Sequence, residues 1–137
     1  MSAVQTVSMG SETEVDPGLV ADGVKLLERL SDALASPDTA FWLWFRDVEG
    51  QRLVLSGGEL FRYGAQAARR RVRVAIEEAP ALQHLTEDLV GVARPGARSV
   101  QVIEGAVSTG PGIHDVRIRN NSVNGVTIRG AYVYRVS

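Results

Sequence analysis

The sequence predicts an α+β fold, mainly β: an antiparallel sheet, or a sandwich- or barrel-like core, with an N-terminal amphipathic helix and one or two short helices. Three observations support this. Apolar residues at helical spacing follow Asp16-Pro17, the densest apolar run is Phe41–Phe45, and Ser99–Ser137 alternates β-prone runs with turn residues. The length of 137 residues suits one domain over 16–137. Residues 1–15 are polar and unpatterned, which predicts a flexible arm.

The first predicted helix begins at Asp16-Pro17, because aspartate is a favoured N-cap residue and proline is tolerated at the first helical position. Apolar residues then recur at spacings of four, three, three and four, which makes one stripe of Val20, Val24, Leu27, Leu30 and Leu34. Ser36-Pro37-Asp38 is expected to end the helix, since the residue before a proline avoids the helical region. The stripe predicts packing on the sheet.

A hairpin is predicted after this helix. Phe41–Phe45 is aromatic and β-prone, and Leu53-Val54-Leu55 is expected to pair with it after a turn at Glu49-Gly50-Gln51. Both faces of the first strand are apolar. Trp42 and Trp44 therefore lie either in a core covered on both sides or at an interface with another subunit.

The middle of the chain fits two patterns. A helical stripe includes Phe61, Ala65 and Ala68, whereas the later part alternates apolar and charged residues as a strand does. We predict a short helix or irregular segment over Glu59–Ala68 and a strand over Arg69–Glu77, with one long helix as the alternative. Pro80 is then expected to start a short helical piece that ends near Gly91.

Ser99–Ser137 is predicted to hold three or four antiparallel strands, because the turns between them are short. The first of these strands covers Ser99–Val107 and the last covers Ala131–Val136, with Tyr132, Tyr134 and Val136 on one face. Turn residues separate the strands at Ser108–Gly112, Asn120-Asn121-Ser122, Asn124-Gly125 and, as a turn or bulge, Arg129-Gly130.

The composition excludes several kinds of site and location. The chain has no cysteine, which removes disulfides, zinc–thiolate sites and thiol nucleophiles and fits a reducing compartment. We see no signal peptide and no apolar run long enough to cross a bilayer. We therefore predict a cytoplasmic or virion-associated protein with no membrane partner.

The net charge of −1 divides unevenly along the chain. Residues 1–60 hold ten acidic and four basic residues, a charge of −6, while residues 61–137 hold six acidic and eleven basic residues, a charge of +5. Opposite charge on the two halves indicates either internal ion pairs or head-to-tail contact between copies. Internal pairing is the simpler interpretation.

No catalytic residue, metal site or cofactor is predicted. His84, Glu87 and Asp88 have the spacing of one helical face, and His114-Asp115 could add ligands, but such spacing arises easily by chance. We interpret them as solvated polar positions. The sequence has no Gly-x-Ser-x-Gly elbow and no phosphate-binding glycine loop.

Eight residues are predicted to contact other subunits: Trp42, Trp44, Arg69, Arg70, Arg71, Arg73, Arg117 and Arg119. The four arginines from Arg69 to Arg73 form the only basic cluster and could bind phosphates. No aromatic residue is interleaved within it, so we favour a solvated face, or ion pairs to Glu77, Glu78 and the acidic first half of the chain.

These features predict a structural or assembly subunit of a homo- or hetero-oligomeric complex, whose partners are itself or other subunits. By analogy of class, it could be a phage virion, tail or injection-machine component. The alternative is a small-molecule-binding domain or small enzyme with an apolar pocket. That pocket would be lined by Trp42, Trp44, Phe61 and Tyr63, with His84 or His114 as the polar group. A second alternative is a nucleic-acid-binding module that uses Arg69–Arg73.

Overall fold

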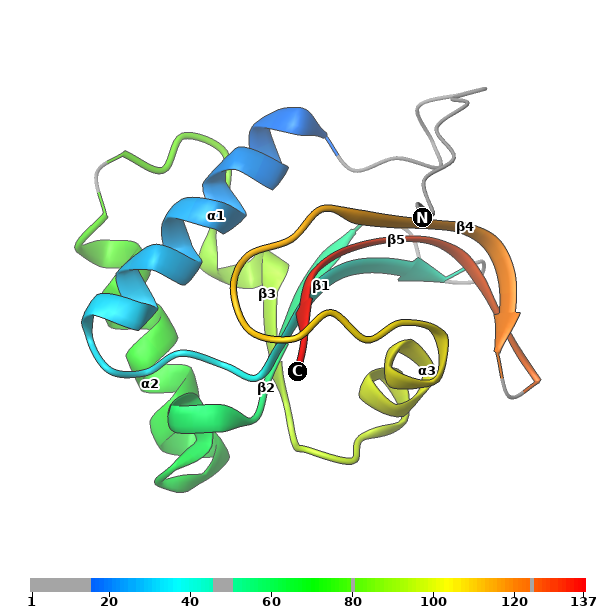
Figure 1. The fold of residues 1–137 in the computed structure, drawn as a ribbon. Helices are drawn as coiled ribbons and strands as arrows, with labels where there is room; N and C mark the ends of the chain where they lie inside the picture. The colour runs from blue at the N-terminus through cyan, green and yellow to red at the C-terminus, as the bar shows by residue number, and fades with distance from the viewer. Residues whose placement is uncertain (1–15, 46–50, 80, 124) are drawn as a thin grey trace.

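A computed structural model of the chain, which describes residues 16–45, 51–79, 81–123 and 125–137, shows an α+β fold (Figure 1). The predicted arm, residues 1–15, lies outside the described residues. The elements in chain order are α1 (Pro17–Asp32), β1 (Thr39–Phe45), β2 (Arg52–Ser56), η2 (Gly58–Phe61), α2 (Gly64–Glu77), η3 (Glu87–Leu89), β3 (Val90–Ala93), α3 (Arg98–Ala106), β4 (Val116–Val123) and β5 (Val126–Val136).

The described strands form a single open sheet in the order β3-β2-β1-β5-β4. Strands β2 and β3 are parallel, with α2 in the connection between them, and the other neighbours are antiparallel. The α+β class is confirmed. Of the two predicted cores, a sheet forms, but it is mixed rather than antiparallel. The sandwich or barrel is wrong for the described residues, because the sheet does not close and helices rather than a second sheet cover its faces.

The molecule has three layers, with α1 and α2 on one face of the sheet and α3 on the other (Figure 1). Strand β1 serves both cores, because successive side chains of a strand point to opposite faces. Ala40 and Trp42 pack beneath α1 and α2, whereas Phe41 and Leu43 pack beneath α3. Trp42 is fully buried within this one chain and has no surface left for a partner.

Two early predictions are confirmed by local geometry. Asp16 caps α1, its Oδ1 accepting a hydrogen bond from the Gly18 backbone N–H at 2.8 Å, and Pro17 is the first helical residue. The helix ends at Asp32, earlier than expected. Strands β1 and β2 pair as the predicted hairpin; of its turn, residues 46–50 lie outside the described residues.

The predicted strand over Arg69–Glu77 is wrong, because α2 covers these residues entirely. The alternative of one long helix holds from Gly64 onward, whereas Glu59–Phe61 belong to the separate turn η2. The buried residues Ala68, Val72 and Ala75 are four and three positions apart, which is the spacing of one helix face. Burial of this face favours a helix over the strand suggested by the alternation. Val74, which that alternation made equivalent to Val72, is 42% exposed.

The predicted helical piece from Pro80 to Gly91 is wrong except for the short turn η3. The chain instead reaches the sheet as β3 and pairs beside β2, with Val90 opposite Leu53 and Val92 opposite Leu55. A parallel neighbour requires a crossover connection, and α2 lies in that connection.

The predicted strand over Ser99–Val107 is also wrong, because α3 occupies most of it. Val100 and Ile103, one helical turn apart, are buried against the sheet, whereas Gln101 and Glu104 are exposed. The apolar content on both strand faces therefore reflected a helix packed on its inner side. This helix makes the fold less β-rich than expected.

The hairpin predicted at Asn124-Gly125 is confirmed: β4 and β5 are antiparallel, and Gly125 has a φ of 80°. Asn124 itself lies outside the described residues. The predicted turn at Asn120-Asn121-Ser122 is wrong, because β4 continues through these residues and pairs Ser122 with Thr127. Pairing with β5 overrides the turn preference of the two asparagines.

Strand β5 carries two irregularities against β1. One falls at Arg129, where a turn or bulge was predicted, since Trp44 pairs with Gly130 and Phe45 with Ile128. The other falls at Tyr134, between the partners of Ala40 and Phe41. An extra residue reverses the alternation of a strand. Tyr132 and Tyr134 therefore face α1, but Val136 packs on the α3 side, contrary to the prediction of one shared face.

The Tyr134 hydroxyl joins the sheet to α1. Trp42 Nε1 donates to it at 2.9 Å, and it donates to the Val20 carbonyl at 2.7 Å. Burial raises the pKa of the Tyr134 phenol above its ordinary value, so it stays protonated and able to donate. The hydroxyl thus satisfies one buried donor and one carbonyl.

We expect Tyr134→Phe to lower the free energy of unfolding by about 1–3 kcal/mol, because the Trp42 indole N–H loses its acceptor inside the core. Urea unfolding measures the change. Tyr63→Phe is the control, since the Tyr63 side chain is exposed and should change stability by less than about 0.5 kcal/mol. Equal effects of the two variants would contradict the bridging role of the Tyr134 hydroxyl.

Candidate functional site

The eight predicted interface residues do not form one surface. Trp42 belongs to the core, and the side chains of Trp44 and Arg119 lie outside the described residues. Arg117 on β4 lies 3.5 Å from Asp115 and over the Tyr132 ring, 5.4 Å from its centroid. Among the predicted interface residues whose side chains the structure describes, the four arginines of α2 are the ones that share an element.

The α2 arginines differ in their partners. Arg73 lies 3.7 Å from Glu87, and Arg71 donates to the Glu59 carbonyl at 3.1 Å. Arg69 and Arg70 are exposed and form no ion pair or hydrogen bond with any residue that the structure describes. Internal pairing therefore leaves part of the cluster available.

The ion pairs expected between this cluster and its neighbouring acids do not form. Glu78 instead pairs with Arg29 of α1 at 2.9 Å. Glu77 is exposed and has no ion-pair partner within the described part of the chain. The acids of α2 thus leave Arg69 and Arg70 unneutralised.

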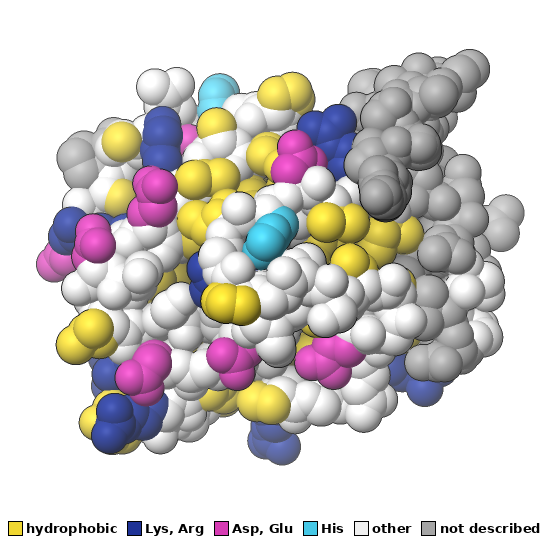
Figure 2. All heavy atoms as spheres, in the orientation of Figure 1, with side chains coloured by type: hydrophobic (Ala, Val, Ile, Leu, Met, Phe, Trp, Pro, Cys, Tyr) yellow, Lys and Arg dark blue, Asp and Glu magenta, His cyan; other side chains and the backbone are white. Residues whose placement is uncertain are grey.

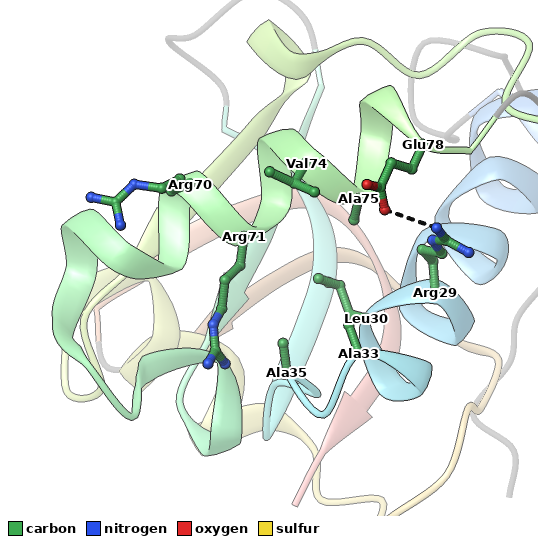
Figure 3. A pocket seen from close by; sticks show the side chains of 9 residues that line it. All are labelled: Arg29, Leu30, Ala33, Ala35, Arg70, Arg71, Val74, Ala75 and Glu78. Atoms are coloured by element: carbon green, nitrogen blue, oxygen red, sulfur yellow. Dashed lines mark hydrogen bonds and ion pairs between the residues drawn. The ribbon is translucent and has the colours of Figure 1, made fainter.

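A pocket of about 210 Å³ opens between α1 and α2 (Figure 3). Its lining consists of Arg29, Leu30, Ala33, Ala35, Arg70, Arg71, Val74, Ala75 and Glu78. The Arg29–Glu78 ion pair bridges the two helices at one end. Arg71 extends from α2 toward the side of Ala35, whereas the Arg70 side chain points away from the apolar residues. An apolar floor with guanidinium groups at its edge suits an apolar group that carries or adjoins negative charge.

Leu34 lies next to this pocket and has an unusual conformation. Its φ is 58°, in the left-handed region, and its side chain is 76% exposed. The Ala35 N–H donates to the Leu30 carbonyl at 2.8 Å and the Leu34 N–H to the Ser31 carbonyl at 3.0 Å. These two bonds define a helix-ending motif whose left-handed position normally holds glycine.

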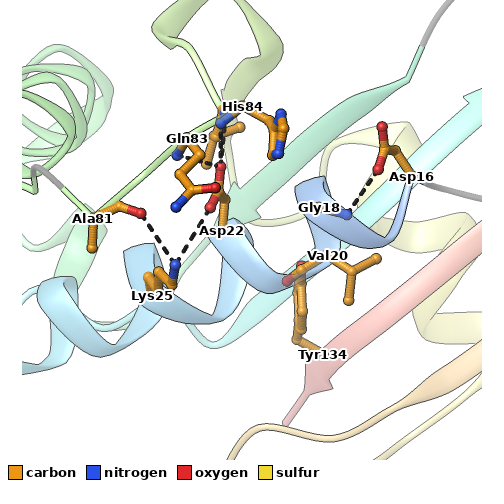
Figure 4. A network of polar contacts seen from close by, with 10 residues as sticks. Asp16, Gly18, Val20, Asp22, Lys25, Ala81, Gln83, His84 and Tyr134 are labelled. Carbon is orange, nitrogen blue, oxygen red and sulfur yellow. Dashed lines mark hydrogen bonds and ion pairs between the residues drawn. The ribbon is translucent and has the colours of Figure 1, made fainter.

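The two histidines contact different parts of the fold. His84 is exposed beside Gly18, and its backbone N–H donates to Asp22 (Figure 4). His114 Nε2 makes a hydrogen bond of 2.8 Å with the Pro111 carbonyl in its own loop. Within the residues that the structure covers, no three His, Asp or Glu side chains are grouped to hold a metal ion.

The apolar pocket expected from the sequence is not the one that forms. Trp42 is in the core, Tyr63 is 66% exposed, and neither Phe61 nor a histidine lines the pocket between α1 and α2. The actual pocket joins residues about forty positions apart. The sequence signal for it was the small size of Ala33, Ala35 and Ala75, which leaves space between the helices.

Two further observations bear on partners. None of the described helices is long and apolar enough to span a membrane. On the face drawn in Figure 2, acidic and basic side chains are interspersed and apolar side chains reach the surface in small groups. That face shows no continuous apolar area comparable to a large interface. The pocket beside Leu34 is therefore the strongest candidate site.

Comparison of the chain with protein-family models, curated proteins and solved structures finds no match.

Proposed function

We propose that this protein is a structural or assembly subunit that binds other protein subunits through the α1/α2 face, meaning the pocket-lining residues together with Leu34. The observation that carries the proposal is an open apolar pocket beside an exposed leucine. A monomer gains nothing from keeping such a leucine in water, whereas a partner that covers it gains its burial.

The chemistry of this face supports a protein contact. Protein interfaces combine an apolar centre with arginine, which is enriched at contacts that dominate affinity. Here Leu30, Val74 and Ala75 supply the apolar centre, and Arg70, which also lines the pocket, has no ion-pair partner among the described residues. The partners are a second copy of the chain, other subunits, or both.

We further propose that the assembly is a phage virion, tail or injection machine, and that the protein is cytoplasmic or virion-associated. Its support is the analogy of class alone. Sedimentation of the protein with assembled particles from its source tests it. Recovery only in the particle-free fraction would remove this assignment and leave the more general assembly role.

We expect the wild-type protein to show a native mass above that of the monomer, and Val74→Glu to reduce it, because a carboxylate would have to be desolvated at the centre of the face. Light scattering over a concentration series, at low and high salt, measures both. Val74 is 42% exposed, so the substitution should leave the fold intact.

Gln66→Glu is the matched control, since it adds the same charge to an exposed position of α2 outside the pocket lining. The control should retain the native mass of the wild type. A wild-type protein that is monomeric at every concentration and salt would count against self-assembly. A mass equally unaffected by both variants would remove the α1/α2 face as the contact.

One observation favours a nucleic-acid-binding module as the second candidate. The guanidinium carbons of Arg62 and Arg71 lie 5.8 and 5.3 Å from the centroid of the exposed Tyr63 ring. The sequence suggested no aromatic residue within the basic cluster, but the fold brings this one beside it. An aromatic ring beside arginines can stack on a base. Binding of single-stranded DNA or RNA that weakens steeply with salt would support this candidate, and no binding at low salt would exclude it.

A further inference from the structure

We propose that the protein forms a two-fold symmetric dimer in which Leu34 of each copy enters the α1/α2 pocket of the other. This inference rests on the proposed assembly role and specifies its first partner, a second copy of the chain. It follows from a protruding leucine next to a pocket of suitable size, and from uncommitted acidic residues on α1 and basic residues on α2.

Leu34 has the properties of a side chain placed for another molecule. It is 76% exposed, the most exposed large apolar side chain among the described residues. It also sits at φ 58°, where a residue with a side chain is disfavoured relative to glycine. The conformation therefore costs stability in the monomer, and the side chain returns no packing within its own chain.

The pocket can accept an aliphatic side chain. Its volume is about 210 Å³, and a cavity of about 150 Å³ lined by aliphatic residues is enough to hold a benzene molecule. Leu30, Val74 and Ala75 line it. Ala33 and Ala35 also line it, and their short side chains leave space for an entering group.

The positions of the leucine and the pocket permit closed symmetry. Leu34 lies between Ala33 and Ala35, and both of these residues line the pocket of the same chain. A two-fold axis beside this segment can thus place each leucine against the other copy's pocket with the same patch used twice. A head-to-tail contact between distant patches would instead continue into a ring or filament.

Charge around the two parts is complementary. Glu28 and Asp32, one helical turn apart near the end of α1, are exposed and have no ion-pair partner in the described part of the chain. Arg70 at the pocket is equally uncommitted. In the dimer the acids next to each leucine approach the arginines at the other pocket, which favours a second copy over an uncharged apolar peptide.

Leu34→Gly separates the dimer contact from fold stability. Glycine relieves the left-handed conformation, so the melting temperature under monomeric, dilute conditions should rise by about 3–5 °C. The dimer dissociation constant should rise by about 100-fold, because a leucine side chain leaves each of two symmetric contacts. Analytical ultracentrifugation of both proteins over a concentration series measures the constant. Leu34→Met keeps an aliphatic side chain of similar length and should retain the dimer.

The outcomes separate this inference from the proposed function. If Val74→Glu dissociates the protein but Leu34→Gly does not, the face is correct and the leucine contact is wrong. If the wild-type protein is monomeric throughout, the dimer and self-assembly both fail, and an acidic protein or a nucleic acid becomes the ligand to screen against the same face. A defined dimer that neither substitution affects would place the contact elsewhere and overturn the inference.

Discussion

Replacing Asp22 with alanine is expected to lower the free energy of unfolding by about 3–5 kcal/mol, among the largest effects of any substitution in this protein. The Asp22 side chain is 2% exposed. Its Oδ2 accepts hydrogen bonds from the backbone N–H groups of Gln83, His84 and Leu85 at 3.0, 2.6 and 2.9 Å (Figure 4). Alanine leaves three donors without an acceptor and releases the segment between α2 and β3 from α1.

The ionised form of Asp22 is the stabilising one. Burial raises the pKa of Asp22, but the three N–H donors and nearby Lys25 lower it more, and the net pKa lies below the ordinary value. A carboxyl whose pKa is lower in the folded state contributes stability above its unfolded pKa of about 4. That contribution is lost as the pH falls through the folded-state value.

Urea unfolding between pH 2 and 7 tests both parts of this expectation. The wild-type protein should lose stability below about pH 4, and Asp22→Asn should be less stable at pH 7 with a shallower acid decline. Glu104→Gln is the matched control, since Glu104 is exposed on α3 and should change neither value appreciably. An Asp22→Asn protein with wild-type stability at pH 7 would contradict the anchoring role.

Gly23→Ala is expected to destabilise the fold by about 2–4 kcal/mol, although alanine is normally the better helix former by about 1 kcal/mol. A Cβ at this position would overlap the Tyr134 hydroxyl and lie 2.7 Å from Cζ of its ring. Tyr134 is fully buried and held by Trp42 and Val20, so the ring cannot move aside without breaking these bonds.

A control and a double variant make this result specific. Gly91→Ala places a methyl group on β3 where no atom lies within 4 Å, so it should be nearly neutral or slightly stabilising. Combining Gly23→Ala with Tyr134→Phe removes the oxygen that the methyl group meets. In thermal or urea unfolding, the double variant should therefore lose less stability than the sum of the losses of the two single variants. Strict additivity would argue against the close approach of helix and tyrosine.

The elements predicted correctly carry their signals within a few residues. Asp16-Pro17 marks the start of α1 through capping, and Asn124-Gly125 marks the hairpin between β4 and β5. The end of α1 was misplaced because nothing local announces a leucine in a left-handed cap at Leu34. Capping and turn residues predict the start of an element more readily than its end, because the end also depends on tertiary structure.

The wrong secondary-structure predictions lie in segments that fit both helical and strand periodicity, where tertiary packing selects one of the two. Val100, Val102 and Ile103 are β-branched and prefer strands, yet they form the buried side of α3 because Phe41 and Val133 offer a sheet face to cover. Strand β3 holds only four residues, too few for a periodic pattern. Strand β3 forms because the crossover through α2 brings this segment beside β2, with which it pairs.

The candidate site was predicted in part. The arginines of α2 were visible as a run of charge, but their helical arrangement separates Arg71, which contacts Glu59 and Tyr63, from the uncommitted Arg69 and Arg70. The pocket depends on the packing of α1 against α2, which no local pattern encodes. For Trp42 the sequence left a core covered on both sides and a subunit interface as alternatives, and the structure places it in the core.

The central position of β1 has a consequence for biosynthesis. Its neighbour β5 joins it through contacts such as Trp42 to Tyr134, 92 residues apart in the chain. At a ribosomal rate of about 5–20 residues per second, β1 waits roughly 5–20 s before its partner is made. During that interval the edge of β1 that pairs with β5 is open, and the face of the sheet opposite α1 and α2 lacks cover until α3 is made. Nascent chains in this state are expected to need chaperone protection, which links efficient production of this protein to how quickly its last strand leaves the ribosome.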